Sequence, residues 1–165
     1  MVKNNLNSFT LIEILIVATI VLVLSGTSLA LFSVYRNDKV LENQTTQFVS
    51  TLELAKNKAS AGDVSLCENS PTPYVDGYSV SIDSSNSQII LTPRCNTAPT
   101  PLIYPIPTNI VYITPTFSVQ FNSQNYQGVT RRFPIKNTVT GKCKFVQIDE
   151  TGLITNGDCS DCTCP

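Results

Sequence analysis

The sequence predicts an α+β fold, in which one long N-terminal α-helix packs on an antiparallel β-sheet head. Residues 9–32 are almost all apolar or small, with Glu13 as the single charged residue. Apolar side chains then recur at spacings of seven, four, three and four residues, which places them on one helix face. They are Leu41, Phe48, Leu52, Ala55 and Ala59. Beyond residue 67, polar and apolar residues alternate, as is typical of strands.

The composition excludes several classes of function. The 165 residues contain no histidine, which removes His-based acid–base catalysis, Ser-His-Asp and Cys-His pairs and His-ligated metal sites. The net charge of −1 does not favour a nucleic-acid protein. The sequence has no Gly-rich phosphate loop and no carboxylate pair with a visible partner. We therefore expect a protein that is not an enzyme and that has no cofactor or metal.

The first predicted element is a helix with two different halves. Residues 9–34 form its transmembrane half, because a spanning helix needs about 20 mostly apolar residues. Residues 35–62 form an amphipathic outer half that ends at Gly62. We expect a single-pass membrane protein, with residues 63–165 as a β-rich head.

Two simpler interpretations of the apolar run stay open. One is a cleaved signal peptide, with Lys3 in its basic region and residues 28–30 as the cleavage site. Against it, Glu13 places a charge inside the apolar core, where charge is costly. The other is a plain anchor helix, in which Glu13 only complements the free N–H groups of the first turn.

The head is predicted to consist of strands. Residues 77–82 and 88–92 form a hairpin around a turn at residues 83–86. Residues 97–107 hold four prolines and should form an exposed loop or a sheet edge. Further strands are expected at residues 109–113, 117–122 and 129–135, and residues 144–149 should pair with residues 153–156.

All six cysteines follow the predicted helix, which favours disulfides in an oxidising compartment. Cys143 and Cys159 fall near opposite positions of the last hairpin and are the best pair. Cys67 and Cys95 flank the first hairpin and are the next pair.

Cys162 and Cys164 then remain, and they either form a disulfide with each other or are free. A competing interpretation combines them with Cys143 and Cys159 in a four-thiolate zinc site. Three aspartates near the C-terminal end also suggest a calcium site, because Ca²⁺ prefers oxygen ligands. Their spacing does not form an ordered ligand pattern, so solvated turn residues are favoured. They are Asp149, Asp158 and Asp161.

Five basic residues form the one basic concentration in the chain. A strip that binds DNA phosphates would need several cations on one face, which alternating strands need not provide. A solvated sheet face is therefore favoured over DNA as a partner. The five residues are Arg131, Arg132, Lys136, Lys142 and Lys144.

Residues 8–13 read Ser-Phe-Thr-Leu-Ile-Glu, behind a short polar leader that contains Lys3. This run, followed by the apolar helix, resembles the processing site of type IV prepilins and type II secretion pseudopilins. The resemblance implies that a prepilin peptidase removes residues 1–8 by cutting between Ser8 and Phe9, and that it methylates the new amino terminus. In this family Gly usually precedes the cut, so Ser8 is a departure.

The same resemblance implies how the chain assembles. Glu13 of one subunit would pair with the new amine of Phe9 on its neighbour, which neutralises both charges inside the fibre. The implied partners are other pilin or pseudopilin subunits, the prepilin peptidase, the inner-membrane assembly platform and membrane lipid. The implied location is the cytoplasmic (inner) membrane, with the head outside the cytoplasm, and an extracellular or periplasmic fibre after assembly. The implied function is a minor pilin or pseudopilin subunit of a type IV pilus-like or type II secretion fibre. The alternative is a membrane-anchored extracytoplasmic module that binds DNA or a surface and does not assemble.

Three short segments of the head resemble the H-type minor pseudopilins and related minor pilins. The first is the end of the helix at residues 52–62, and the second is the Asp-Gly-Tyr strand opening at residues 76–78. The third is the late strand at residues 143–148, followed by residues 151–154. A general pilin-like sheet remains the alternative for this part of the chain.

Overall fold

The computed structural model describes residues 10–67, 74–96, 98–114, 117–122, 126, 128–160 and 162, and only the backbone of residues 26–31. The chain forms two compact units, Met1–Arg36 and Asn37–Pro165. One helix, α1 (Leu11–Ala61), begins in the first unit and ends in the second. The eight strands β1 to β8 of the described residues all lie in the second unit.

The end of α1 is set by Gly62, as the sequence predicts. Gly62 has a φ of +62°, a left-handed conformation that glycine adopts without a Cβ clash. Its N–H donates to the carbonyl of Ala59 at 3.2 Å, and the N–H of Asp63 donates to the carbonyl of Lys58 at 3.0 Å. These two hydrogen bonds form a Schellman motif, which satisfies carbonyls that the helix would otherwise leave free.

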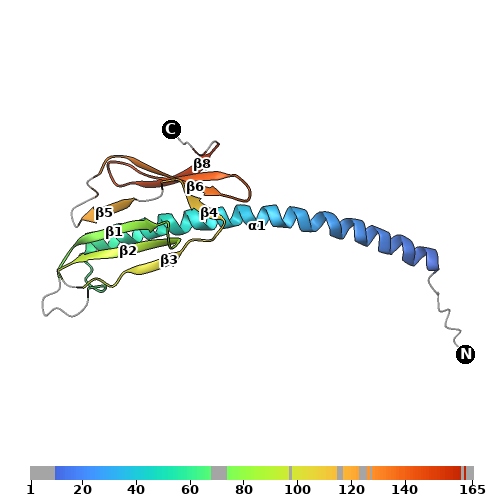
Figure 1. The fold of residues 1–165 in the computed structure, drawn as a ribbon, viewed down its shortest axis with the longest axis horizontal. Coiled ribbons are helices and arrows are strands. Elements are labelled where there is room, and N and C mark those ends of the chain that lie inside the picture. Colours follow the sequence, from blue (N-terminus) through green and yellow to red (C-terminus); the bar gives the residue numbers. More distant parts are fainter. Residues whose placement is uncertain are drawn as a thin grey trace, which may run out of the picture. The chain divides into compact units, whose positions relative to one another are not determined.

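The strands form two antiparallel sheets instead of the single sheet expected (Figure 1). The first has the order β3-β2-β1-β5 and consists of Leu102–Pro105, Gln88–Cys95, Val75–Asp83 and Ser118–Asn122. The second has the order β4-β6-β7-β8 and consists of Ile110–Tyr112, Arg131–Asn137, Cys143–Ile148 and Ile154–Cys159. Strand β5 joins β1 across a long stretch of chain. A local alternation pattern carries no information about such a pairing.

The predicted strands are otherwise confirmed. The hairpin of β1 and β2 turns at residues 84–87, and β7 pairs with β8 around residues 149–153. The proline-rich segment contains β3, which is an edge strand of the first sheet. Prolines are tolerated there because an edge strand leaves one side of its backbone unpaired.

The core lies where the second part of α1 meets the sheets within the second unit. All five apolar residues predicted on one helix face are buried: Leu41, Phe48, Leu52, Ala55 and Ala59 are at most 2 % exposed. The ring of Phe48 contacts Tyr112, Phe117 and Phe133 edge-on, with centroid distances of 5.4, 5.8 and 5.7 Å. The predicted mixture of one helix with antiparallel strands is therefore confirmed.

Candidate functional site

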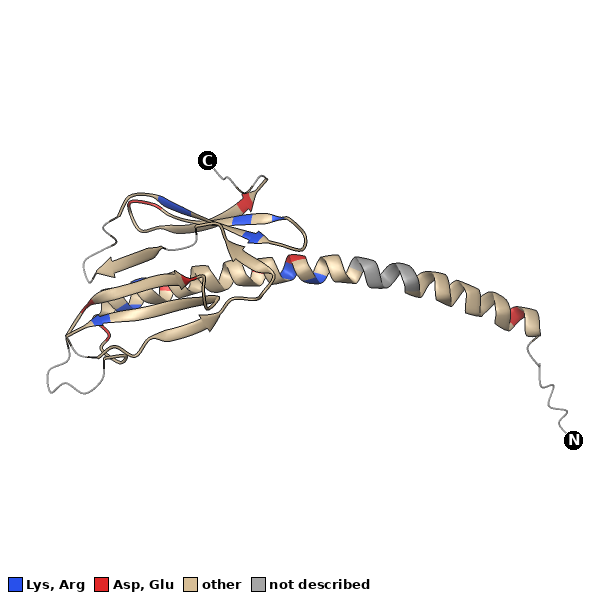
Figure 2. Ribbon diagram, viewed as in Figure 1, with Lys and Arg blue, Asp and Glu red and all other residues tan. Residues whose placement is uncertain are grey.

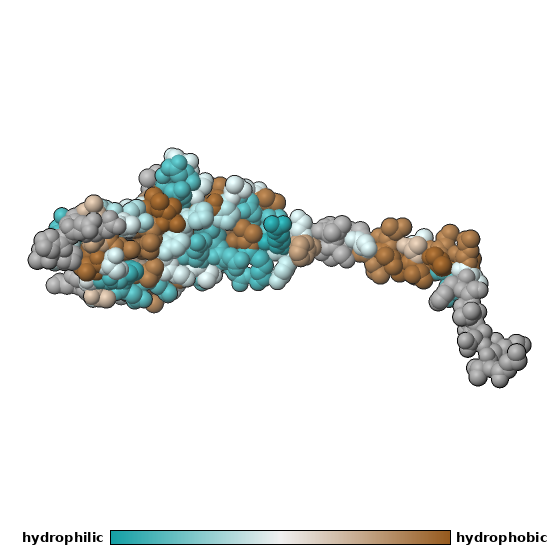
Figure 3. Space-filling view, turned by 90° about the horizontal axis from the view of Figure 1, so that it is seen from below, coloured by the Kyte–Doolittle hydropathy of each residue, from teal (hydrophilic) through white to brown (hydrophobic). Residues whose placement is uncertain are grey.

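The described start of α1 is a helix with exposed apolar side chains. In this segment, residues 11–25, the large apolar side chains are 51–83 % exposed. They follow one another at residues 14–17 and again at residues 20–24, so apolar groups surround the helix and do not form one stripe. Figures 2 and 3 show this stretch as nearly uncharged and strongly hydrophobic. We call residues 11–25 the apolar segment.

Glu13 is the one charged residue of the apolar segment. Its N–H donates to the Oγ1 of Thr10 at 3.3 Å and to the carbonyl of Thr10 at 3.1 Å. Thr10 thus caps the helix, and a glutamate three residues later is the arrangement of a capping box. Within the described residues the carboxylate of Glu13 has no ion-pair partner. The negative charge lies in the first turn, where it complements the helix dipole.

Several predicted sites fall outside the described residues. These are the leader at residues 1–8, with the cleavage position at Ser8 and Phe9, the side chains of residues 26–31 within the predicted membrane half, and the candidate ligands Asp161 and Cys164. Among the residues that the structure describes, no helix is sufficiently long and apolar to cross a membrane.

A polar cluster holds α1 to the second sheet where the helix enters the second unit. The side chain of Asn137 is fully buried, and its Nδ2 donates to the carbonyl of Asn37 at 2.8 Å. The Nδ2 of Asn109 donates to the Oδ1 of Asn37 at 3.1 Å. Beside them, Nζ of Lys142 donates to Asp38 at 2.6 Å. No sequence signal indicates this cluster, because the bonded residues lie 72 to 104 positions apart and share no motif.

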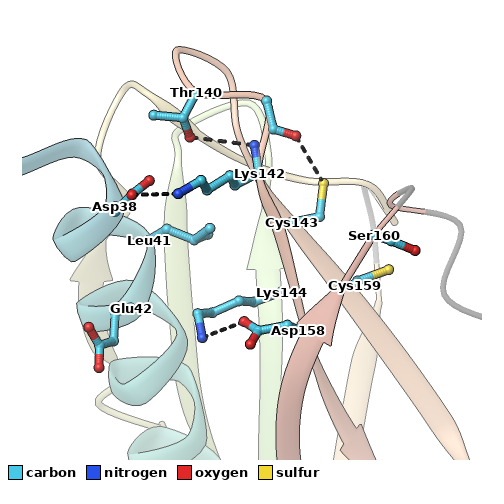
Figure 4. A pocket seen from close by; sticks show the side chains of 11 residues that line it. Asp38, Leu41, Glu42, Thr140, Lys142, Cys143, Lys144, Asp158, Cys159 and Ser160 are labelled. Carbon is cyan, nitrogen blue, oxygen red and sulfur yellow. Dashed lines mark hydrogen bonds and ion pairs between the residues drawn. The ribbon is translucent and has the colours of Figure 1, made fainter. Parts of the chain in front are cut away.

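An open cavity of about 570 Å³ lies between α1 and the β7–β8 hairpin (Figure 4). Its charged side chains are paired: Lys142 with Asp38, and Lys144 with Asp158 at 2.8 Å. The hydrogen bond from Lys144 lowers the pKa of Asp158. Both lysines of the lining are already paired with a carboxylate, so the cavity presents no unpaired lysine to an anionic ligand.

Glu42 lies at the edge of this cavity and pairs with Lys39 on the same helix at 2.6 Å. The hydrogen bond and the charge of Lys39 lower the pKa of Glu42. The Oδ1 atom of Asp38 is buried and has no hydrogen-bond partner among the described residues. The other oxygen of this carboxylate is the one that accepts from Lys142.

The basic residues are distributed over different environments. Lys142 and Lys144 are neutralised by aspartates, as described above. The guanidinium of Arg132 donates to Gln147 at 2.8 Å and lies 4.8 Å from the ring centre of Phe145. Arg131 and Lys136 are exposed on β6. This arrangement agrees better with a solvated sheet face than with a phosphate-binding strip.

The disulfides confirm one predicted pair and correct the other two. Cys67 is bonded to Cys95 as expected. Cys143 is bonded to Cys162, so the predicted pairs Cys143–Cys159 and Cys162–Cys164 are wrong. The register prediction itself holds, because Cys143 and Cys159 are opposite each other in β7 and β8. Cys162 lies beyond the end of β8 and has a φ of +61°, and its Cα atom is 5.4 Å from that of Cys143.

The zinc interpretation is also wrong, because Cys143, Cys159 and Cys162 are all disulfide-bonded. Among the described residues, no group of three or more acidic or cysteine side chains is placed to hold a metal ion. The carboxylate of Asp149 accepts from Thr151 and from the N–H of Leu153, at 2.6 and 2.9 Å. The hydrogen bond from Thr151 contributes most to lowering the pKa of Asp149.

Comparison with protein-family models, with curated proteins and with solved structures finds no match to this chain.

Proposed function

We propose that this chain is a minor pilin or pseudopilin subunit of a type IV pilus-like or type II secretion fibre. The proposal depends on one observation above all: the apolar segment exposes large side chains all around α1, with Glu13 as its single charge. Burying each such side chain is worth about 1.5–3 kcal/mol. A helix of this kind therefore favours an apolar environment, first lipid and then the helices of neighbouring subunits.

The position of Glu13 supports an assembly role. Its carboxylate has no ion-pair partner among the described residues, yet the surrounding side chains are apolar. A carboxylate buried among apolar helices is costly unless an opposite charge meets it. Cleavage between Ser8 and Phe9 would create that charge, the amine of Phe9. The pair would form between two subunits and fix their axial register.

Processing of the leader is the direct test. The full chain, in detergent or inner-membrane vesicles, is incubated with a prepilin peptidase, and the new N-terminus is read by mass spectrometry. We expect loss of residues 1–8 and a chain that begins at Phe9. A chain that begins after Ala30 would indicate a signal peptide. An uncut chain would favour the membrane-anchored binding module for DNA or a surface.

The carboxylate is tested by Glu13→Ala in cells that assemble the fibre. We expect the variant to be cleaved and inserted normally, but its recovery in sheared fibres to fall at least about tenfold, the equivalent of about 1.4 kcal/mol. Glu53→Ala removes an exposed carboxylate from the same helix within the second unit and serves as the matched control. Incorporation of the Glu13 variant at the level of this control would contradict the assembly role.

A further inference from the structure

Three cysteines lie together where β7 begins and β8 ends. Cys143 is bonded to Cys162, and their Cα atoms are 5.4 Å apart. Cys159 is the register partner of Cys143 across the antiparallel pair, and it too is disulfide-bonded. Cys143 therefore has one bonded neighbour and a second half-cystine directly opposite.

The geometry permits Cys143 to bond either neighbour. Residues opposite each other in an antiparallel pair have Cα atoms about 4.5 or 5.5 Å apart, and their side chains are on the same face. A disulfide needs a Cα separation of about 4.4–6.8 Å. Both Cys162 and Cys159 thus meet this requirement without movement of the strands. We propose that Cys143 can form either of two disulfides, one with Cys162 and one with Cys159. Exchange from the first to the second releases Cys162 from its bond to Cys143 on β7.

The two pairings differ in what they require of the backbone. Bonding of Cys143 to Cys162 accompanies the left-handed φ of +61° at Cys162, a conformation that a residue other than glycine adopts only when its surroundings hold it there. Bonding to Cys159 needs only the existing strand register. Cys143, Cys159 and Ser160 also line the cavity beside α1. Exchange therefore alters one wall of that cavity.

The exchange needs a thiol as a catalyst but no net oxidant. A small-molecule thiolate attacks the sulfur of Cys162, which is half-buried, whereas Cys143 is 5 % exposed. The bond between the two cysteines breaks, and Cys143 leaves as a thiolate. That thiolate attacks the sulfur of Cys159 and displaces the thiolate of the present partner of Cys159. The displaced thiolate then attacks Cys162 and regenerates the catalyst, so that two disulfides are consumed and two are formed.

The variant Cys162→Ser tests the second pairing in the full chain. Digestion with trypsin and an Asp-specific protease, after alkylation of free thiols, places the three cysteines in separate fragments. These are residues 143–144, 158–160 and 161–165. We expect the fragments 143–144 and 158–160 to be linked to each other, with a complete loss of alkylated Cys143. An alkylated Cys143, or its linkage to residues 161–165, would overturn the proposal.

The variant Cys95→Ser is the matched control. It also deprives one cysteine, Cys67, of its partner, but it removes no cysteine from the group around Cys143. Cys67 should then be alkylated, and the link between residues 143–144 and 161–165 should persist. This result shows that an orphaned cysteine does not rearrange the pairing near Cys143 by itself.

The unaltered chain provides a test that needs no variant to fold. It is incubated under native conditions with reduced and oxidised glutathione, quenched with acid, alkylated and digested in the same way. We expect the linked fragments 143–144 and 158–160, without residues 161–165, to appear as the original linkage declines. Persistence of the original linkage alone, or only a glutathione adduct at Cys162, would overturn the proposal.

Discussion

Gly77 lies at a bulge of β1, where the register against β2 shifts between Val75 and Gly77. Its φ is +152°, and a Cβ at this position would lie 2.1 Å from the backbone oxygen of Phe121 on β5. No side-chain movement relieves a clash with backbone atoms. The glycine is therefore required for β1 and β5 to approach each other.

The variant Gly77→Ala should lower the free energy of unfolding by more than about 2 kcal/mol, because it combines an unfavourable φ with a backbone clash. The measurement is urea unfolding of the full chain in detergent. Gly141→Ala is the control, since Gly141 has a φ of +71° but open space around its Cβ position. Its loss should be about 1–2 kcal/mol, the conformational cost alone. Equal losses would contradict the importance of the contact with Phe121.

The connection of α1 to the second sheet depends on the turn between β6 and β7. Asn137 closes this turn, because its Oδ1 accepts from the N–H groups of Val139 and Thr140 at 2.9 and 3.2 Å. The Nδ2 of the same side chain donates a hydrogen bond to the carbonyl of Asn37 on α1. One buried amide thus serves both the turn and the position of the helix along the sheet.

The variant Asn137→Ala should cost about 2–3 kcal/mol of unfolding free energy, because it leaves buried polar groups without hydrogen bonds. Thr138→Ala in the same turn removes one exposed hydrogen bond, from its Oγ1 to the carbonyl of Asn109, and should cost less than about 1 kcal/mol. Thermal and urea unfolding of both variants provide the comparison. A loss at Asn137 no larger than that at Thr138 would show that the turn does not hold the helix.

Several elements were predictable because their signals are local. The end of α1 follows from Gly62, and its buried face follows from the helical spacing of residues such as Phe48 and Leu52. The β1–β2 hairpin and the edge position of β3 follow from alternation and from proline. The Asn37–Asn137 contact was not predictable, since asparagine is common in turns and nothing in the sequence connects these two positions.

Acid sensitivity is a property of the whole second unit. Among the described residues, five of its carboxylates have pKa values lowered by hydrogen bonds in the folded chain. They are Glu42, Asp63, Asp83, Asp149 and Asp158. For Asp63, the hydrogen bond from Lys58 and the N–H of Ser65 lower the pKa from 3.8 to about 2. A lowered pKa means that the folded state binds the proton less tightly than the unfolded state does.

The stabilisation from Asp63 should therefore be complete above about pH 4 and should disappear as the pH falls to about 2. We expect the free energy of unfolding to decline over this range, and Asp63→Asn to make the decline less steep. Lys58→Met should act in the same direction, because it removes the main cause of the shift. Urea unfolding at a series of pH values between 5 and 2 measures the slope. An unchanged slope in both variants would contradict this role.

The sequence by itself determined the helix, most strands, the buried helix face and the Cys67–Cys95 pair, because each depends on spacing within a short stretch of chain. It also provided the resemblance at residues 8–13 on which the proposed function draws. Only the tertiary structure decided that the strands divide into two sheets, that Cys143 bonds Cys162, and that Lys142 is neutralised by Asp38. These contacts join residues that are distant in the sequence, and local alternation and spacing do not specify which distant segments meet.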